Sequence, residues 1–230
     1  MISALIGPRG CLRDNAWICG EYLTSRQHDI ERALTLHIEL SALALGFSLL
    51  VAVPLTLIGM QRAWLRGVVL GIAGVVYTIP SLALFVLITP YFGIFSNAPI
   101  VIALVGYAQL LLLRNIFTGL EEVPADVIDA AKGMGYGRTR LLTHVQLPLA
   151  LPAILAGLRV TSVSTVALLS IGGLLGRGGL GQLLYDGYQQ ELNAQVLTAL
   201  VLIVALALTY DAILLLVQRL TTPWTRATTR

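Results

Sequence analysis

The chain has 230 residues, of which 57% are hydrophobic and only 12% are charged, and its mean hydropathy is +0.82. Because soluble domains carry about 25% charged residues and need a polar surface, this composition excludes an ordinary soluble domain and predicts a protein that lies in lipid. The formal net charge of +3 is small and the basic residues are spread between apolar stretches, so the charge gives no indication of nucleic-acid binding.

Residues 1–33 form a polar N-terminal segment that lacks the apolar stretch of a cleavable signal peptide. Two structures fit it, a loosely ordered tail or a short helix in the membrane interface, where aromatic residues favour headgroup depth. Cys11 and Cys19 have no metal-ligand spacing; they are ordinary thiols, or a disulfide if this end is extracytoplasmic. The residues that would share the apolar face of the helix are Trp17, Ile18, Tyr22 and Leu23.

Five apolar stretches are long enough to cross a bilayer, since about 20 helical residues match the thickness of the hydrocarbon core. They show no alternation of polar and apolar residues, which argues against an outer-membrane barrel. Pro54 and Pro80 lie inside two of them and are tolerated where neighbouring helices satisfy the freed carbonyl groups. The predicted fold is therefore all-α, a polytopic membrane protein with about five transmembrane helices. The predicted spans are 34–60, 67–93, 98–118, 155–175 and 195–218.

The distribution of basic residues predicts the orientation, because cytoplasmic loops are enriched in Lys and Arg. Ten basic residues lie after the first span, around the loop after the third span and in the tail, against five on the other side. The N-terminus is therefore expected outside and the C-terminus inside. This divides the chain into an extracytoplasmic segment (1–33), a transmembrane domain (34–220) and a cytoplasmic tail (221–230). The ten are Arg62, Arg66, Arg114, Lys132, Arg138, Arg140, Arg159, Arg219, Arg226 and Arg230; the five are Arg9, Arg13, Arg26, Arg32 and Arg177.

The loop 119–150 is too long for a turn and too polar to span a membrane. Pro124 suits the start of a helix that continues to Lys132, with acidic residues in its first turns and a basic residue in its last. Gly133 and Gly135 then predict a sharp end of that helix, with a positive φ at the glycine that ends it.

A second short helix is expected at 137–146, ended by Pro148 and Pro152. The small side chains of Ala130 and Ala131 on the first helix would let another surface approach closely. The loop therefore predicts a cytoplasmic helix, a glycine hinge and a second helix, arranged as a docking element.

The same loop resembles a signature of the permease subunits of ATP-binding-cassette importers. That signature reads Glu-Ala-Ala, three residues, Gly, nine residues, then Ile-x-Leu-Pro. The spacing fits at every position, and the two departures, Asp for Glu and Val for Ile, are mild. The matching residues are Asp129, Ala130, Ala131, Gly135, Val145, Gln146, Leu147 and Pro148.

Two further segments resemble the permeases that import quaternary ammonium osmoprotectants such as glycine betaine, choline and carnitine. They are residues 76–94 and residues 155–187. The second departs from the usual Ile-Gly-x-Gly-Gly-Leu-Gly, since Arg177 lies among its glycines. Methionine-type permeases share a glycine loop, so a permease for methionine or another small solute is the alternative.

The resemblance implies a transmembrane permease domain that works in the cytoplasmic membrane of a bacterium, as one of two permease subunits, either two copies or a copy and a relative. Two ATPase subunits and an extracytoplasmic substrate-binding protein would complete the importer. The chain has no GxxxxGK[ST] motif, so ATP would be bound by the ATPase and no cofactor by this chain. The glycine-rich residues 172–181 would be a flexible outer turn or a contact for the binding protein. The expected ATPase-coupling residues are Asp129, Ala130, Ala131, Gly135, Leu147 and Pro148.

Polar residues inside the spans are candidates for the translocation path, since unpaired polar groups in lipid are costly. Ser and Thr commonly bond to their own helix instead, and Asp211 is expected to have a structural partner. Aromatic faces would attract a quaternary ammonium ion by cation–π interaction. The path candidates are Tyr77, Ser81, Tyr107, Thr161 and Ser164.

Two other classes of protein fit less well. An ion-coupled secondary transporter usually shows internal repeats, and none is visible in five spans. A membrane-embedded enzyme needs convergent nucleophiles, bases or metal ligands, but the three His and two Cys residues are not at ligand spacing. We therefore expect no catalytic residue and no metal site.

Overall fold

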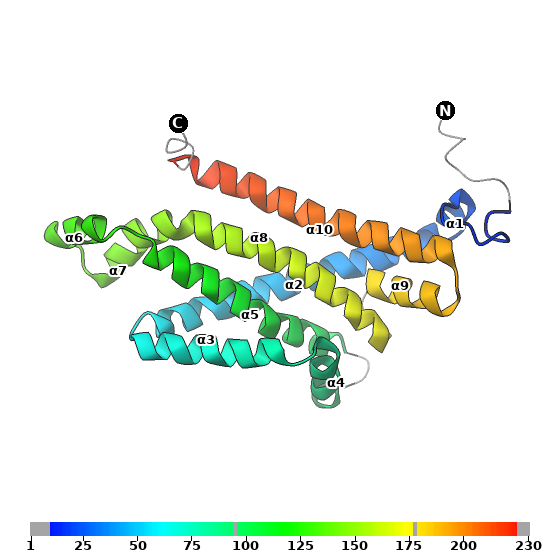
Figure 1. Ribbon diagram of the computed structural model, residues 1–230, viewed down its shortest axis with the longest axis horizontal. Coiled ribbons are helices and arrows are strands. Elements are labelled where there is room, and N and C mark those ends of the chain that lie inside the picture. The colour runs from blue at the N-terminus through cyan, green and yellow to red at the C-terminus, as the bar shows by residue number, and fades with distance from the viewer. Residues whose placement is uncertain (1–9, 94–95, 177–178, 225–230) are drawn as a thin grey trace. The chain divides into compact units, whose positions relative to one another are not determined.

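The computed structural model describes residues 10–93, 96–176 and 179–224, and within them every regular element is a helix (Figure 1). The all-α prediction is therefore confirmed. The elements are α1 (Gly20–Ser25), α2 (Gln27–Gly59), α3 (Ala63–Thr78), α4 (Ser81–Phe92), α5 (Ala98–Glu121), α6 (Ala125–Gly133), α7 (Arg138–Leu141), η2 (Leu142–Gln146, π-helical), α8 (Leu147–Ile171), η3 (Gly172–Leu175, 3-10), α9 (Leu180–Gln189) and α10 (Asn193–Thr221).

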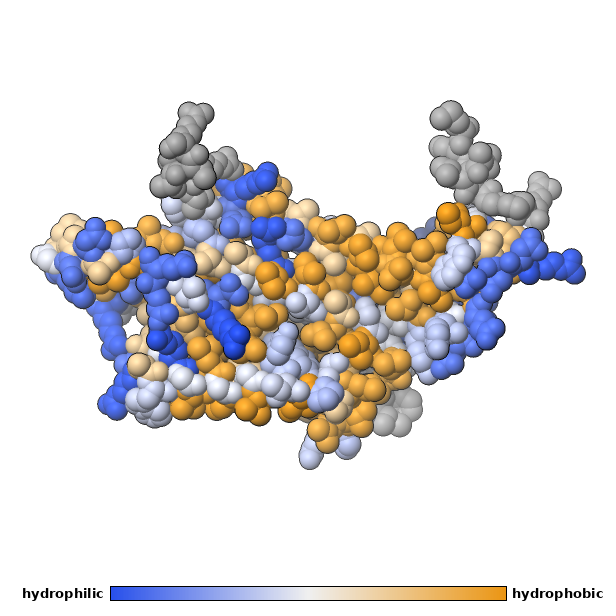
Figure 2. All heavy atoms as spheres, in the orientation of Figure 1, coloured by the Kyte–Doolittle hydropathy of each residue, from blue (hydrophilic) through white to orange (hydrophobic). Residues whose placement is uncertain are grey.

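Four helical runs among the described residues are long and apolar enough to span a membrane, or five if α3 and α4 count as one span. The four are α2, α5, the run Arg138–Leu175 and α10. Only 6% of the most apolar window of α10 is buried within the chain, so this helix offers its side chains to lipid or to another subunit. Figure 2 shows apolar side chains along α10, whereas hydrophilic ones gather around α6 and α7.

The predicted span 67–93 is not one continuous helix. It is interrupted between α3 and α4, where Pro80 has an extended backbone (φ −56, ψ 131) and accepts the first bond of α4 from Leu84 N–H. Proline has no N–H to continue the helix that precedes it and disfavours the helical conformation of the residue before it. Pro80 is therefore a helix start, whereas Pro54 is tolerated inside α2 as expected.

The predicted end of a helix at Pro148 and Pro152 is wrong. Helical structure runs without interruption from Arg138 to Leu175, and both prolines lie inside α8. Pro148 is the second residue of α8 and comes just after the wider π-helical turns of η2, which accommodate a proline ring and its missing hydrogen bond. The second helix of the docking element, α7, and the apolar span thus belong to one helical run.

The chain forms two compact units, each with its own core. The first comprises the described residues of 1–46, 79–105 and 163–209, and the second those of 47–78, 106–162 and 210–230. The first unit is centred on Leu40, Phe85, Leu104 and Leu169, with a smaller cluster around Tyr22. The second is centred on residues of α3, α5 and α8, namely Ala73, Leu113, Phe117 and Ala150.

The N-terminal segment is structured from residue 10 onward. The alternative of a loosely ordered tail is therefore wrong for residues 10–33. Cys11 and Cys19 form a disulfide. Asn15 accepts a bond from Asn193 N–H (2.9 Å) and donates to the Glu191 carbonyl (2.6 Å), which fastens the segment to the turn before α10. The predicted shared helix face is wrong, because Tyr22 is buried while Trp17, Ile18 and Leu23 are exposed.

The glycine-rich stretch 172–181 is closely packed over its described residues, not an open turn. Gly173 lies so near Gly181 that a Cβ would overlap the backbone, and Gly181 approaches Ser170 in the same way. The stretch therefore holds α9 against the end of α8. Arg177, predicted to lie among these glycines, is outside the described residues, as are Arg9, Arg226 and Arg230.

Candidate functional site

The predicted docking helix is α6, and its start and length are as expected. Pro124 precedes it with an extended backbone (ψ 135) and accepts a bond from Ile128 N–H (3.2 Å). Asp126 lies in the first turn and Lys132 in the last, each near the helix end of opposite partial charge.

Gly135 ends α6 in a Schellman motif. Its φ is +83, Tyr136 N–H donates to the Ala131 carbonyl (3.1 Å), and Gly135 N–H donates to the Lys132 carbonyl (2.9 Å). The positive φ predicted for this glycine is confirmed, and it reverses the chain immediately before α7. Arg140 of α7 then lies over the ring of Tyr136, 4.4 Å from its centre, a contact that fixes the turn between the helices.

The two alanines of the signature face different ways. Ala131 is 2% exposed and packs into its own unit, whereas Asp129 and Ala130 are exposed. Val127 and Met134 are exposed with Ala130, at a spacing that puts all three on one side of the helix. Val127 and Met134 were not predicted as docking residues, although they lie at i and i+7 with Ala130 at i+3, a spacing that the sequence shows.

Leu147 and Pro148, the end of the signature, lie at the start of α8. Leu147 is exposed and Pro148 half-buried. They follow η2, so they form the passage from the docking segment into the long apolar helix.

The path candidates Tyr77 and Tyr107 meet in the second unit. Their rings pack edge to face, with centres 5.9 Å apart. Tyr107 is 4% exposed and Tyr77 is 41% exposed, so the pair presents one accessible aromatic ring supported by a buried one.

The other path candidates show less. Thr161 is buried and its hydroxyl donates to the Gly157 carbonyl of its own helix (2.8 Å), as Thr side chains in spans commonly do. Ser81, the first residue of α4, and Ser164, within α8, are half-buried.

Asp211 has the structural partner expected for it. Arg159 of α8 donates to its two carboxylate oxygens, from Nε to Oδ1 at 2.8 Å and from Nη2 to Oδ2 at 2.9 Å. Such a two-pronged pair is strong and lowers the cost of both charges within a span. Arg159 thus lies in the middle of α8, whereas the orientation was predicted with Arg159 counted near a loop. Without it, nine basic residues remain on the expected cytoplasmic side against five on the other.

Among the described residues, one group is compact enough to hold a metal ion, formed by Cys11, Cys19 and Glu21. The two sulfur atoms are bonded to each other and are not thiolates, the form that ligates metals.

Comparison with known proteins assigns the family. Residues 44–226 match the family "Binding-protein-dependent transport system inner membrane component". The chain is similar to the osmoprotectant import permease protein OsmW of Salmonella typhimurium, with 34% identity over 81% of this chain and 89% of the relative. It is also similar to the choline transport system permease protein OpuBB of Bacillus subtilis, with 31% identity over 81% of this chain and 86% of the relative.

Among solved structures, the chain is similar to an inward-facing form of the MetNI methionine ABC transporter. The TM-score is 0.71 at 25% identity, over 88% of this chain and 97% of the other. The fold thus agrees with the sequence matches, which extend over four-fifths of the chain. The chain belongs to the family of binding-protein-dependent transport system inner membrane components, the permease subunits of ABC importers.

Proposed function

We propose that this permease carries a small quaternary ammonium osmoprotectant, such as glycine betaine, choline or carnitine, across the cytoplasmic membrane of a bacterium. The observation that carries the proposal is the similarity, over most of the chain, to permeases named for osmoprotectants and for choline. The alternative is another small solute such as methionine, in line with the fold similarity to a methionine transporter.

Coupling to ATP hydrolysis falls to α6 in this proposal. Its exposed side offers Val127, Ala130 and Met134 to a groove of an ATPase subunit, while Ala131 packs back into the permease. Asp129 is exposed beside them and pairs with Lys132 (3.1 Å). Apolar contact of this kind gains about 25 cal/mol for each Å² of surface removed from water, which suits a docking site.

Movement of a docked α6 would be transmitted to the transmembrane helices through the turn at Gly135 and through α7. Gly135 sets the angle between α6 and α7, and α7 belongs to the helical run Arg138–Leu175. A rigid helix transmits a push from its cytoplasmic end along its length, as in rigid-body switches between two states. Leu147 and Pro148 lie within that run and are proposed coupling residues with Asp129, Ala130, Ala131 and Gly135.

The partners in this proposal are an ATPase subunit that binds the ATP, a second permease subunit and an extracytoplasmic substrate-binding protein. The N-terminus is proposed outside and the C-terminus inside. The disulfide of Cys11 and Cys19 supports this orientation, because disulfides persist in oxidising compartments.

Uptake of labelled glycine betaine tests the proposal. Cells that lack this gene and every other betaine transporter are compared at high osmolarity with the same cells carrying the restored gene. Uptake that depends on the gene supports the osmoprotectant substrate. Uptake that is absent with and without the gene, while methionine uptake depends on it, replaces the substrate and leaves the importer permease in place.

A further inference from the structure

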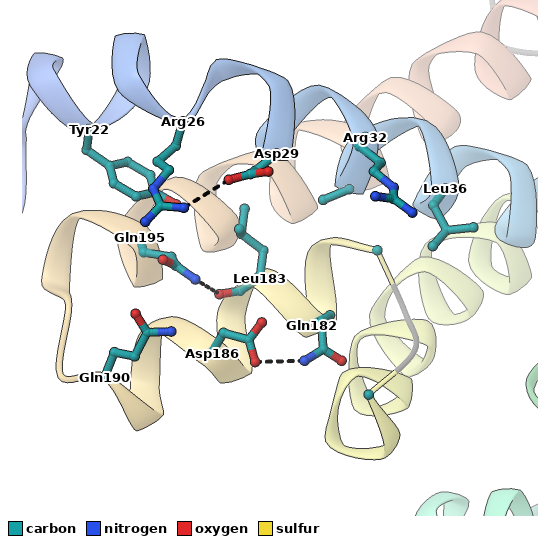
Figure 3. Close-up of a pocket in the computed structure, with 13 residues that line it drawn as sticks. Tyr22, Arg26, Asp29, Arg32, Leu36, Gln182, Leu183, Asp186, Gln190 and Gln195 are labelled. Carbon is teal, nitrogen blue, oxygen red and sulfur yellow. Dashed lines mark hydrogen bonds and ion pairs between the residues drawn. The ribbon is translucent and has the colours of Figure 1, made fainter. Parts of the chain in front are cut away.

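A polar pocket lies in the first unit, between α2 and α9 (Figure 3). Its volume is about 400 Å³, within the range of small-molecule sites. One side is formed by α1 and the first turns of α2, with Tyr22, Arg26 and Arg32; the other is formed by α9, with Gln182 and Asp186. None of these residues belongs to the docking helix or to the path candidates.

The walls of the pocket are held in place by close contacts. Gly179, at the start of α9, has a φ of +52 and lies so near the Ala33 carbonyl and His37 that any side chain there would collide with α2. Gln195, near the start of α10, donates to the Leu183 carbonyl (2.9 Å), which ties α9 to α10. These contacts make the described walls of the pocket part of the packed fold.

The charges of the pocket are separated across it. On the wall formed by α1 and the start of α2, Arg26 and Asp29 form an ion pair, with Nη1 of Arg26 3.2 Å from Oδ2 of Asp29. Their charges therefore neutralise each other. Arg32 of α2 has no ion-pair partner among the described residues, and Asp186 of α9 has only a neutral one, the Gln182 amide that donates to it (2.7 Å). One positive and one negative group thus remain on opposite sides of a pocket with no net charge (Figure 3).

One buried polar atom in the pocket lacks a hydrogen-bond partner among the described residues. The side-chain oxygen of Gln182 is buried without a donor. The Gln182 oxygen therefore adds partial negative charge beside Asp186, which favours a cationic group on the α9 side of the pocket. On the opposite wall, Tyr22 is 2% exposed and burial raises its pKa to about 12, so its hydroxyl stays protonated at neutral pH.

We propose that this pocket binds a small zwitterion, with the carboxylate of the ligand on Arg32 and its cationic group beside Asp186 and the Gln182 oxygen. The inference rests on the proposed function in taking the transported solute as the ligand, and it narrows the substrate class to solutes that carry a carboxylate. Glycine betaine and carnitine meet this requirement, whereas choline has the cationic group alone.

The test measures binding of labelled glycine betaine to the purified permease–ATPase complex in lipid nanodiscs, without the substrate-binding protein. Arg32→Gln and Asp186→Asn are each expected to weaken binding about tenfold, since each removes a charged contact. Tyr22→Phe is expected to change binding little, because Tyr22 lies beside Arg26 and away from Arg32 (Figure 3). Glu31→Gln is the matched control, since Glu31 is exposed on α2 and does not line the pocket.

Correct folding of each variant is read from its ATPase activity and its assembly in the same nanodiscs. Unchanged binding by both Arg32→Gln and Asp186→Asn would overturn the proposal, and so would choline bound as tightly as glycine betaine. If these two variants bind the solute normally but no longer bind the substrate-binding protein, the proposal is also overturned. The pocket would then be a contact site for the substrate-binding protein.

A panel that adds methionine and carnitine separates this inference from the proposed function. If methionine binds and is sensitive to Arg32→Gln while betaine does not bind, the zwitterion pocket stands and the osmoprotectant substrate fails. If betaine uptake depends on the gene but no zwitterion binds the complex, the pocket fails and the proposed function stands.

Discussion

Gly135 holds a backbone conformation that a branched side chain resists, with φ +83 at the end of α6. Gly135→Val is expected to abolish uptake while membrane insertion and dimer assembly stay intact. A positive φ costs a β-branched residue on the order of 1–3 kcal/mol, which would unwind the end of α6 and misplace the helix. Uptake of labelled solute, with the amount of assembled protein in the membrane, measures the effect.

Gly133→Ala is the matched control for that variant. Gly133 is the last residue of α6 and has open space where a Cβ would lie, so the alanine is expected to be harmless. Normal transport by Gly135→Val would remove the glycine hinge from the coupling mechanism.

Tyr77 and Tyr107 are the residues expected to contact the transported solute. A quaternary ammonium ion has no hydrogen-bond donor and is attracted by the faces of aromatic rings. At roughly 0.5–2 kcal/mol per ring, Tyr77→Ala is expected to lower uptake about 2- to 30-fold. Tyr107→Ala also removes a buried ring and leaves a cavity, which can lower the amount of folded protein. Its uptake is therefore divided by the amount of folded protein before it is compared with the wild type.

Tyr77→Phe and Tyr107→Phe keep the ring faces and are expected to retain uptake. Unchanged uptake in both alanine variants would end the proposal that this edge-to-face pair contacts the solute.

At the scale of helices, α8 and α10 are joined by the pair of Arg159 and Asp211. Asp211→Asn leaves an unpaired guanidinium within a span, and breaking a buried pair costs about 3–5 kcal/mol, less here because both side chains are partly exposed. The variant is expected to unfold at a lower temperature in detergent than the wild-type chain.

The exchanged pair Arg159→Asp with Asp211→Arg is expected to recover part of that loss. Thr209→Ala is a matched control on α10, because the Thr209 hydroxyl is exposed and bonds only to its own helix. Equal thermal stability of Asp211→Asn and Thr209→Ala would show that the ion pair does not hold the two helices together.

Helix positions followed from the sequence better than helix ends did. The pattern of Pro124, Lys132 and Gly135 predicted α6 correctly, because its signals are local: a proline start, charged ends and a glycine cap. Pro80 and Pro148 were misread, since a proline breaks one helix and is absorbed in another according to its surroundings. The π-helical turns that accommodate Pro148 have no signal of their own in the sequence.

For the whole molecule, contacts between distant segments were beyond the sequence. Arg159 was counted as a loop charge because its partner Asp211 lies 52 residues further on. The pocket beside Arg32 and Asp186 was missed for the same reason, since α2 and α9 are brought together only by the fold. The family signature, in contrast, lies within 20 residues of chain and was visible at once.

Orientation is the remaining property of the whole molecule, and the two ends of the chain predict it together. Basic residues predominate in the sequence around α6, and the disulfide lies in the N-terminal segment, which is expected outside. Cys11→Ser with Cys19→Ser gives a chain without cysteine, into which Asp14→Cys or Glu122→Cys, both at exposed positions, is introduced. A membrane-impermeant maleimide added to intact spheroplasts is expected to label Asp14→Cys and to reach Glu122→Cys only after the membrane is opened. The reverse labelling would place α6 outside, where no ATPase can dock, and would remove the coupling role of α6 altogether.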